Sequence, residues 1–92
     1  MLVIMKKAAG QAGESLAQFL PRGASITASW ASGTDHVNLQ VQTGADSYED
    51  AKDSGGAAVQ LTTAHPFHQI LAAGNYRVTA GSGSDITVSV NY

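Results

Sequence analysis

Hydrophobic and polar residues alternate strictly at the C-terminal end of this chain, in residues 85–92. Because successive side chains of a β-strand point to opposite faces, this pattern predicts a half-buried antiparallel strand. A glycine-rich turn, Gly81–Ser84, separates it from an apolar segment that begins near Tyr76, so we expect the last two strands to form a hairpin. The apolar positions of the terminal strand are Ile86, Val88, Val90 and Tyr92.

The middle of the chain repeats this alternation. Residues 25–30 place Ile26, Ala28 and Trp30 on one face, and residues 37–42 place three aliphatic side chains on one face. The turn residues between the two segments predict a second hairpin. Trp30 would lie near the end of that hairpin, where a large ring can close a small core.

Shorter apolar segments complete the pattern. Residues 14–20 are compatible with helical spacing, but the β character of the rest favours a strand or an irregular segment. Residues 57–62 and 67–71 predict further strands. Strands at intervals of about ten residues predict an all-β fold, a small antiparallel β-sandwich of about seven strands, immunoglobulin-like or jelly-roll-like. Tyr76 follows a Gly-Asn corner, where its hydroxyl is expected to bond back to the turn backbone.

A short apolar run near the N-terminal end consists of Leu2, Val3, Ile4 and Met5. It predicts either an edge strand of the protein's own sheet or an arm that binds a partner by adding a strand to another chain. A flexible connection follows it. We therefore divide the chain into an N-terminal arm or edge strand with its connection, residues 1–13, and a single β-sandwich domain, residues 14–92.

Composition narrows the range of functions. The chain has 92 residues, no cysteine and a formal net charge of −2. The lack of cysteine excludes disulfides and thiolate metal sites, and it favours assembly in a reducing cytoplasm. A net negative charge does not favour binding to nucleic acid. No apolar stretch approaches the ~20 residues of a membrane span. Lys6 and Lys7 follow the apolar run instead of preceding it, which is the wrong order for a secretory leader.

The low content of charged residues has two interpretations. Charged residues make up 13% of the chain, against about 25% in ordinary soluble domains. A surface poor in Lys and Glu is typical of one that a partner covers. It is also typical of a β-rich chain that avoids charge on its strands.

One acidic segment is a candidate calcium site. Its carboxylates occur at positions i, i+3, i+4 and i+7, which would share one face of a helix or could surround a cation in a loop. The alternative is a solvated acidic loop that protects the neighbouring sheet edges from aggregation. The four residues are Asp46, Glu49, Asp50 and Asp53.

Other chemistry is less favoured. His36, His65 and His68 would need further converging ligands to hold zinc, so the alternative is partly exposed histidines at a strand edge. The chain has no Gly-x-Ser-x-Gly elbow and no cysteine nucleophile, so we assign no catalytic residue, no enzyme activity and no cofactor. We expect Tyr48 to be the exposed aromatic residue, either as an anchor for a partner or as a ring lying over the sheet.

About four-fifths of the chain resembles the small β-sandwich accessory virion proteins of tailed bacteriophages, of which capsid decoration or cement proteins are the best defined. The chain departs from that pattern in its acidic segment, residues 46–53. The residues that carry the resemblance are Leu20-Pro21-Arg22-Gly23-Ala24-Ser25-Ile26-Thr27, Trp30-Ala31-Ser32-Gly33-Thr34, Val37-Asn38-Leu39-Gln40-Val41-Gln42 and Leu71-Ala72-Ala73-Gly74-Asn75-Tyr76-Arg77-Val78.

The resemblance implies a non-enzymatic structural protein of the virion, assembled in the host cytoplasm. It implies that the chain binds and stabilises the phage head through other virion proteins, above all the major capsid protein. It also implies a homo-oligomer or many copies on a symmetric shell, with no nucleic-acid or membrane partner. The alternative is a carbohydrate- or receptor-binding β-sandwich module of a tail or surface assembly.

Overall fold

The computed structural model describes residues 2–92, so Met1 of the N-terminal segment lies outside it. These residues form ten β-strands, paired antiparallel throughout, and no helix. The all-β prediction is therefore confirmed. The strands are β1 (Leu2–Lys7), β2 (Gly13–Glu14), β3 (Gln18–Leu20), β4 (Ser25–Ser32), β5 (Val37–Gln42), β6 (Tyr48–Asp50), β7 (Gln60–Leu61), β8 (Phe67–Gln69), β9 (Gly74–Ala80) and β10 (Asp85–Asn91).

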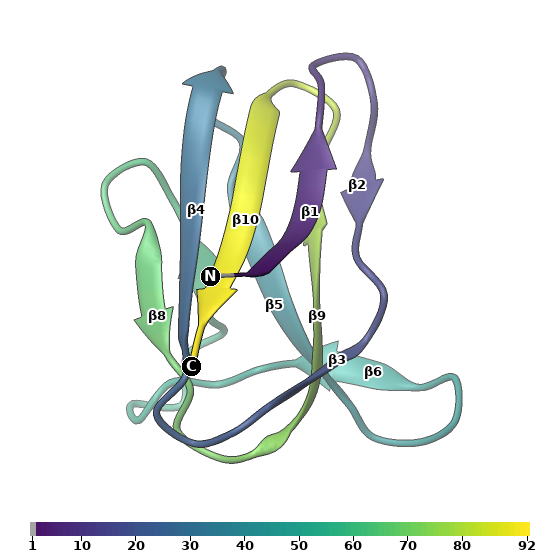
Figure 1. The fold of residues 1–92 in the computed structure, drawn as a ribbon, viewed down its shortest axis with the longest axis vertical. Coiled ribbons are helices and arrows are strands. Elements are labelled where there is room, and N and C mark those ends of the chain that lie inside the picture. The colour runs from purple at the N-terminus through teal and green to yellow at the C-terminus, as the bar shows by residue number, and fades with distance from the viewer. Residues whose placement is uncertain (1) are drawn as a thin grey trace.

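The strands form two sheets that face each other as a sandwich (Figure 1). The four-stranded sheet has the order β1-β10-β4-β8. The six-stranded sheet has the order β2-β9-β5-β6, with β3 also paired to β9 and β7 also paired to β5. Because β2 with β3 and β6 with β7 act as two interrupted strands, the ten strands fill eight positions, the number of a jelly roll.

The pairing follows the path of one long hairpin rolled up on itself. From the ends inward, β1 pairs with β10, β2 and β3 pair with β9, β4 pairs with β8, and β5 pairs with β6 and β7. Rolling then brings β10 against β4 and β9 against β5. Of the two architectures expected from the sequence, this strand order is that of the jelly roll.

Two predicted hairpins are wrong. β4 pairs with β8 and β10, whereas β5 pairs with strands of the other sheet, so the segment between them crosses the sandwich. The Gly81–Ser84 turn likewise joins β9 and β10, which belong to opposite sheets. Alternation does not separate a hairpin from such an arch, because strands of both sheets point their apolar side chains at the same core.

The core is aliphatic and continuous between the sheets. The prediction that the Tyr76 hydroxyl bonds back to its corner is confirmed, since it donates to the carbonyl oxygen of Ala72 over 2.7 Å. Tyr92, expected on the apolar face, follows the end of β10 and is 65% exposed. The largest fully buried side chains are Leu20, Ile26, Val37, Leu39, Leu61, Ile70, Val78, Ile86, Val88 and Val90.

Each edge of the two sheets is short or interrupted. β1 changes register between Val3 and Met5, and Lys6 stands near its end. β8 has three residues and follows Pro66. The edges of the other sheet are the broken pairs β2 with β3 and β6 with β7. Such features oppose the addition of a foreign strand.

The two arches that carry the chain from β4 to β5 and from β9 to β10 bind each other. Asp35 Oδ2 accepts a hydrogen bond from Gly83 N over 2.6 Å, and Asp35 N donates to the hydroxyl of the buried Ser84 over 2.8 Å. Trp30 Nε1 donates to the Asp35 carbonyl oxygen over 2.8 Å, and Lys7 Nζ donates to the Ser84 carbonyl oxygen. We call the contact of Gly33 and Asp35 with Gly83 and Ser84 the arch contact.

Substitution of Gly33 should test the arch contact. Gly33 has φ +77°, and a Cβ there would approach the Gly83 carbonyl oxygen to 2.5 Å and overlap Ser84 Oγ. Gly23 has φ +91° and no atom near the same position. We expect Gly23→Ala to cost about 1 kcal/mol, the backbone penalty alone, and Gly33→Ala to cost about 1–3 kcal/mol more. Urea unfolding of both variants measures the difference, and equal losses would contradict the arch contact.

Candidate functional site

The structure does not bring the four acidic residues of the calcium prediction together. β6 occupies the middle of their segment and pairs with β5, so there is no helix to align them. Asp53 lies beyond it and caps its own turn, where Oδ1 accepts from Gly55 N over 2.9 Å and from Ala57 N over 3.0 Å. Within residues 2–92 no three His, Cys, Asp or Glu side chains are placed to hold a metal ion.

Tyr48 is not the exposed aromatic residue that the sequence predicts. Its ring is half-buried under Arg77, whose guanidinium carbon lies 3.6 Å from the ring centroid. Arg77 is held in place by Gln40 Oε1 over 2.8 Å and by Glu14 Oε1 over 3.3 Å. Arg77, reaching across β5 from β9, thus covers the ring by cation–π stacking. The expected exposure is wrong, the ring lies over the sheet as the alternative had it, and a partner contact at Tyr48 stays a prediction.

The apolar N-terminal run is an edge strand of the chain's own sheet in the structure. Leu2 pairs with Val90 and Met5 with Val88, both on β10. Leu2 and Val3 are exposed, Ile4 is half-buried, and Met5 belongs to the core. The four residues predicted to bind a partner therefore differ in exposure, because Leu2 and Val3 reach the surface whereas Ile4 is half-buried and Met5 is buried.

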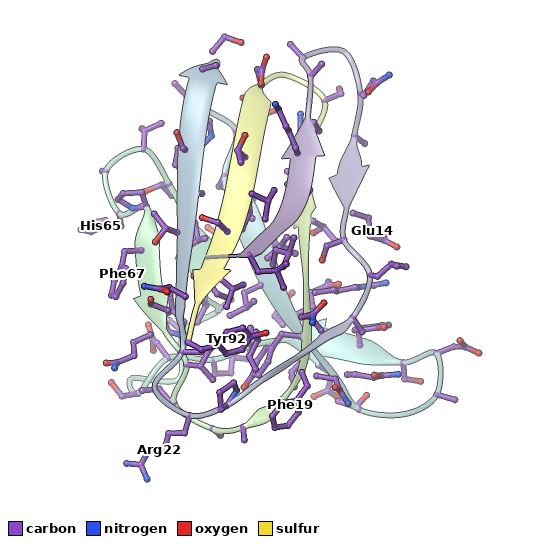
Figure 2. The ribbon with its side chains drawn as sticks, in the orientation of Figure 1. Glu14, Phe19, Arg22, His65, Phe67 and Tyr92 are labelled. Carbon is purple, nitrogen blue, oxygen red and sulfur yellow. The ribbon has the colours of Figure 1, made fainter. Side chains whose placement is uncertain are left out.

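Four exposed apolar side chains lie at one edge of the sandwich, on β1, on β3 and just after β10. Leu2 is 41%, Val3 52%, Phe19 56% and Tyr92 65% exposed. The Tyr92 hydroxyl lies 3.5 Å from the Phe19 carbonyl oxygen, which accepts its hydrogen bond; both residues are labelled in Figure 2. We call these four residues the terminal apolar cluster. Leu16, in the connection between β2 and β3, adds an 89% exposed side chain to the same edge of the sandwich.

The sequence gives a partial indication of this cluster. Phe19 precedes the fully buried Leu20 on β3, so alternation places it outward. Tyr92 continues the apolar alternation of β10. It is exposed because the strand ends at Asn91, one residue before it. Phe67, 58% exposed on β8, is a further exposed ring at the opposite edge.

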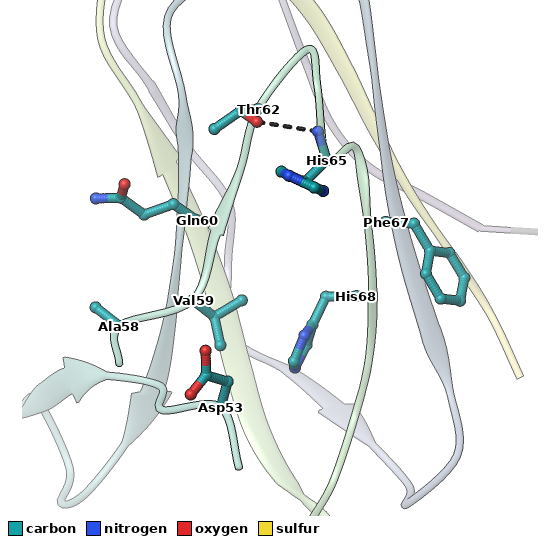
Figure 3. Close-up of a pocket in the computed structure, with 8 residues that line it drawn as sticks. All are labelled: Asp53, Ala58, Val59, Gln60, Thr62, His65, Phe67 and His68. Carbon is teal, nitrogen blue, oxygen red and sulfur yellow. Dashed lines mark hydrogen bonds between the residues drawn. The ribbon is translucent and has the colours of Figure 1, made fainter. Parts of the chain in front are cut away.

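Two of the three histidines lie in one groove between the edges of the two sheets (Figure 3). The groove has a volume of about 310 Å³ and runs between β7 and β8. His65 and His68 point into it from one side, and Asp53 lies across from His68 (Figure 3). His36 lies elsewhere, next to Asp35 in the arch. The residues lining the groove are Asp53, Ala58, Val59, Gln60, Thr62, His65, Phe67 and His68.

His68 stands at the centre of this region. It pairs with the buried Ile26, so it takes the inward position of β8 where the rest of the sheet places aliphatic residues. It also lines a second cavity of about 220 Å³ beside Ile70 and Tyr76. Burial lowers the pKa of His68 below its ordinary value, and the nearby Asp53 opposes this in part.

Comparison of the chain with known protein families, with curated proteins and with solved structures gave no match. The described residues contain no helix long and apolar enough to cross a membrane. The chemistry of the surface is therefore the basis for assigning a function.

Stability should depend on pH through His68. Because its pKa is lowered in the folded state, the unfolded chain, with an ordinary value of 6.5, takes up the proton first as pH falls. The contribution of His68 is then fully present above that value and decreases below it. Urea unfolding between about pH 7 and pH 5 should show a smaller loss of stability for His68→Gln than for the wild type. His36→Gln, an exposed control, should lose as much as the wild type, and an unchanged slope in His68→Gln would refute the prediction.

Proposed function

We propose that this protein is a non-enzymatic structural subunit of a virion that binds and stabilises the head of a tailed phage as a decoration protein. The observation that carries the proposal is the terminal apolar cluster, Leu2, Val3, Phe19 and Tyr92, on a small sandwich with few charges. The partner is the major capsid protein, contacted by many copies on a symmetric shell. Jelly rolls also serve in viral capsids, which is an analogy of architecture only.

The composition of the cluster suits protein–protein docking. Exposed apolar patches on small soluble domains mark interaction sites, and interfaces are enriched in Phe and Tyr. Tyr92, just after β10, donates its hydroxyl to the backbone carbonyl oxygen of Phe19 on β3, so both exposed rings belong to one edge and could contact one partner. Side chains of this kind, buried at the centre of an interface, supply most of its binding energy.

The surface next to the cluster supports the same role. Beside the cluster, β10 turns Thr87, Ser89 and Asn91 to the outer face of its sheet, so little charge would be desolvated along this strand if the edge packed on a shell. On β1, Lys6 pairs with Thr87 and is an exposed charge on the same face.

Docking would use the folded sandwich as a rigid body. Met5 is a core residue, and the edge strands are bulged, broken or short, so release of β1 as an exchanged arm would open the core. Binding of the folded state to a shell would in turn stabilise a domain of this size.

Replacement of the two rings tests the proposal. The Phe19→Ser, Tyr92→Ser double variant removes the exposed rings but leaves the core in place, so we expect folding to persist and binding to fall by about tenfold or more. The measurement is co-sedimentation of the purified protein with virus heads encoded by the same genome, with the bound copies counted per head. The wild type should saturate the heads in many copies.

Phe67→Ser is the matched control, because it removes an equally exposed ring from the opposite edge of the sandwich. It should bind the heads as the wild type does. Wild-type protein that fails to sediment with the heads, or a double variant that binds them equally well, would reject the proposal.

A further inference from the structure

We propose that the groove between β7 and β8 binds one unit of a neutral sugar through Asp53, His65 and His68. This inference goes beyond a structural role and does not depend on it, because the groove and the terminal apolar cluster lie at opposite edges of the sandwich.

The histidine wall is fixed by a tight turn. Thr62 N donates to the His65 carbonyl oxygen and His65 N donates to the Thr62 carbonyl oxygen, each over 3.1 Å. Thr62 Oγ1 accepts a further bond from His65 N over 3.0 Å (Figure 3). Ala28 N on β4 donates to the Pro66 carbonyl oxygen over 2.8 Å, which ties the end of the turn to the four-stranded sheet. The two imidazoles therefore start from a rigid backbone, and a preorganised site loses less entropy when it binds.

The opposite wall presents an oriented carboxylate. Asp53 Oδ1 accepts two backbone N–H groups of its own turn, those of Gly55 and Ala57, which fixes the direction of the group. These bonds leave Oδ2 free to accept from a ligand. Asp53 N donates to the Ala57 carbonyl oxygen over 2.9 Å, so the turn is closed on both sides.

The free polar atoms suit a ligand whose hydroxyls both donate and accept. A neutral imidazole offers one donor and one acceptor, and the Thr62 hydroxyl keeps a proton to donate. Asp53 contributes a charged acceptor, which forms stronger hydrogen bonds than a neutral one. Figure 3 shows the Phe67 ring and the Gln60 amide directed away from the groove, so the ligand contacts come from the other lining residues.

The floor of the groove suits a sugar ring, and its charge disfavours anions. Val59, which points between the two walls in Figure 3, gives the floor an apolar surface that can contact the C–H face of a sugar ring. An anionic ligand would face Asp53 and the nearby acidic strand β6, with no Lys or Arg among the lining residues. A metal ion would lack a converging set of three ligands within residues 2–92. The volume of about 310 Å³ is at the small end of ligand pockets, which fits a single sugar unit.

The test is amide chemical-shift mapping of the whole chain with glucose, galactose, mannose, N-acetylglucosamine, lactose and maltose as probes. Concentrations of up to about 20 mM would detect millimolar dissociation constants. We expect at least one sugar to shift amides of residues 53–68 saturably. Asp53→Asn, which keeps the oxygen that caps the turn, and His68→Gln should each weaken this binding about tenfold.

Two matched controls lie outside the groove. Asp46→Asn makes the same charge change in the same acidic segment, and His36→Gln makes the same replacement in the arch. Both should bind the sugar as the wild type does. The proposal is overturned if no probe shifts residues 53–68, if the shifts map to other residues, or if Asp53→Asn and His68→Gln bind as tightly as the controls.

Discussion

The contact between the two arches sets the geometry on which the rest of this protein depends. β4, β5, β9 and β10 are the central strands of the two sheets, and the chain passes between the sheets twice among them. Both crossings meet at one place, where Asp35 accepts from the backbone of Gly83 and donates its own N–H to Ser84. Because Ser84 is buried and directly precedes β10, this contact fixes where the strand enters the four-stranded sheet.

This strand order determines which strands, and therefore which exposed side chains, lie at each edge of the sandwich. With β10 and β9 central, β1 and the broken pair β2 with β3 form one edge, and β8 and the broken pair β6 with β7 form the other. The first edge collects exposed apolar side chains, and the second collects the histidine groove. The rolled topology therefore places two surfaces of different chemistry on opposite sides of a small domain. One suits a protein partner, and the other suits a polar ligand.

The sequence was sufficient for the class of fold and for most of the core, because period-two alternation reports burial directly. Ile26, Val37, Leu39 and Val78 all point inward as expected. The pairing of strands was not accessible in this way, since alternation is identical whether two strands share a sheet or face each other across it. Trp30 was expected at a hairpin end, and its indole instead bonds to the carbonyl oxygen of Asp35 within an arch.

The candidate sites were also predictable only in part, where local alternation was sufficient. The exposure of Phe19 follows from its neighbour Leu20, but the stacking of Arg77 on Tyr48 joins strands far apart in sequence and could not be inferred locally. The carboxylates of residues 46–53 were grouped by helical spacing, and β6 removed that spacing by forming a strand. His68 occupies an inward position that sequence patterns normally assign to an apolar residue. Its place beside the groove therefore became visible only from the pairing of β8 with β4.

Docking of the folded sandwich on phage heads through the terminal apolar cluster is the proposal to test first. Hydrogen exchange of the protein bound to heads, compared with the free protein, tests this directly, because burial of an interface slows exchange of the amides beneath it. We predict added protection at residues 2–4, 18–20 and 90–92, with β4 and β5 unchanged. Protection confined to residues 53–68, or loss of protection along β1, would contradict docking through this cluster by an intact sandwich.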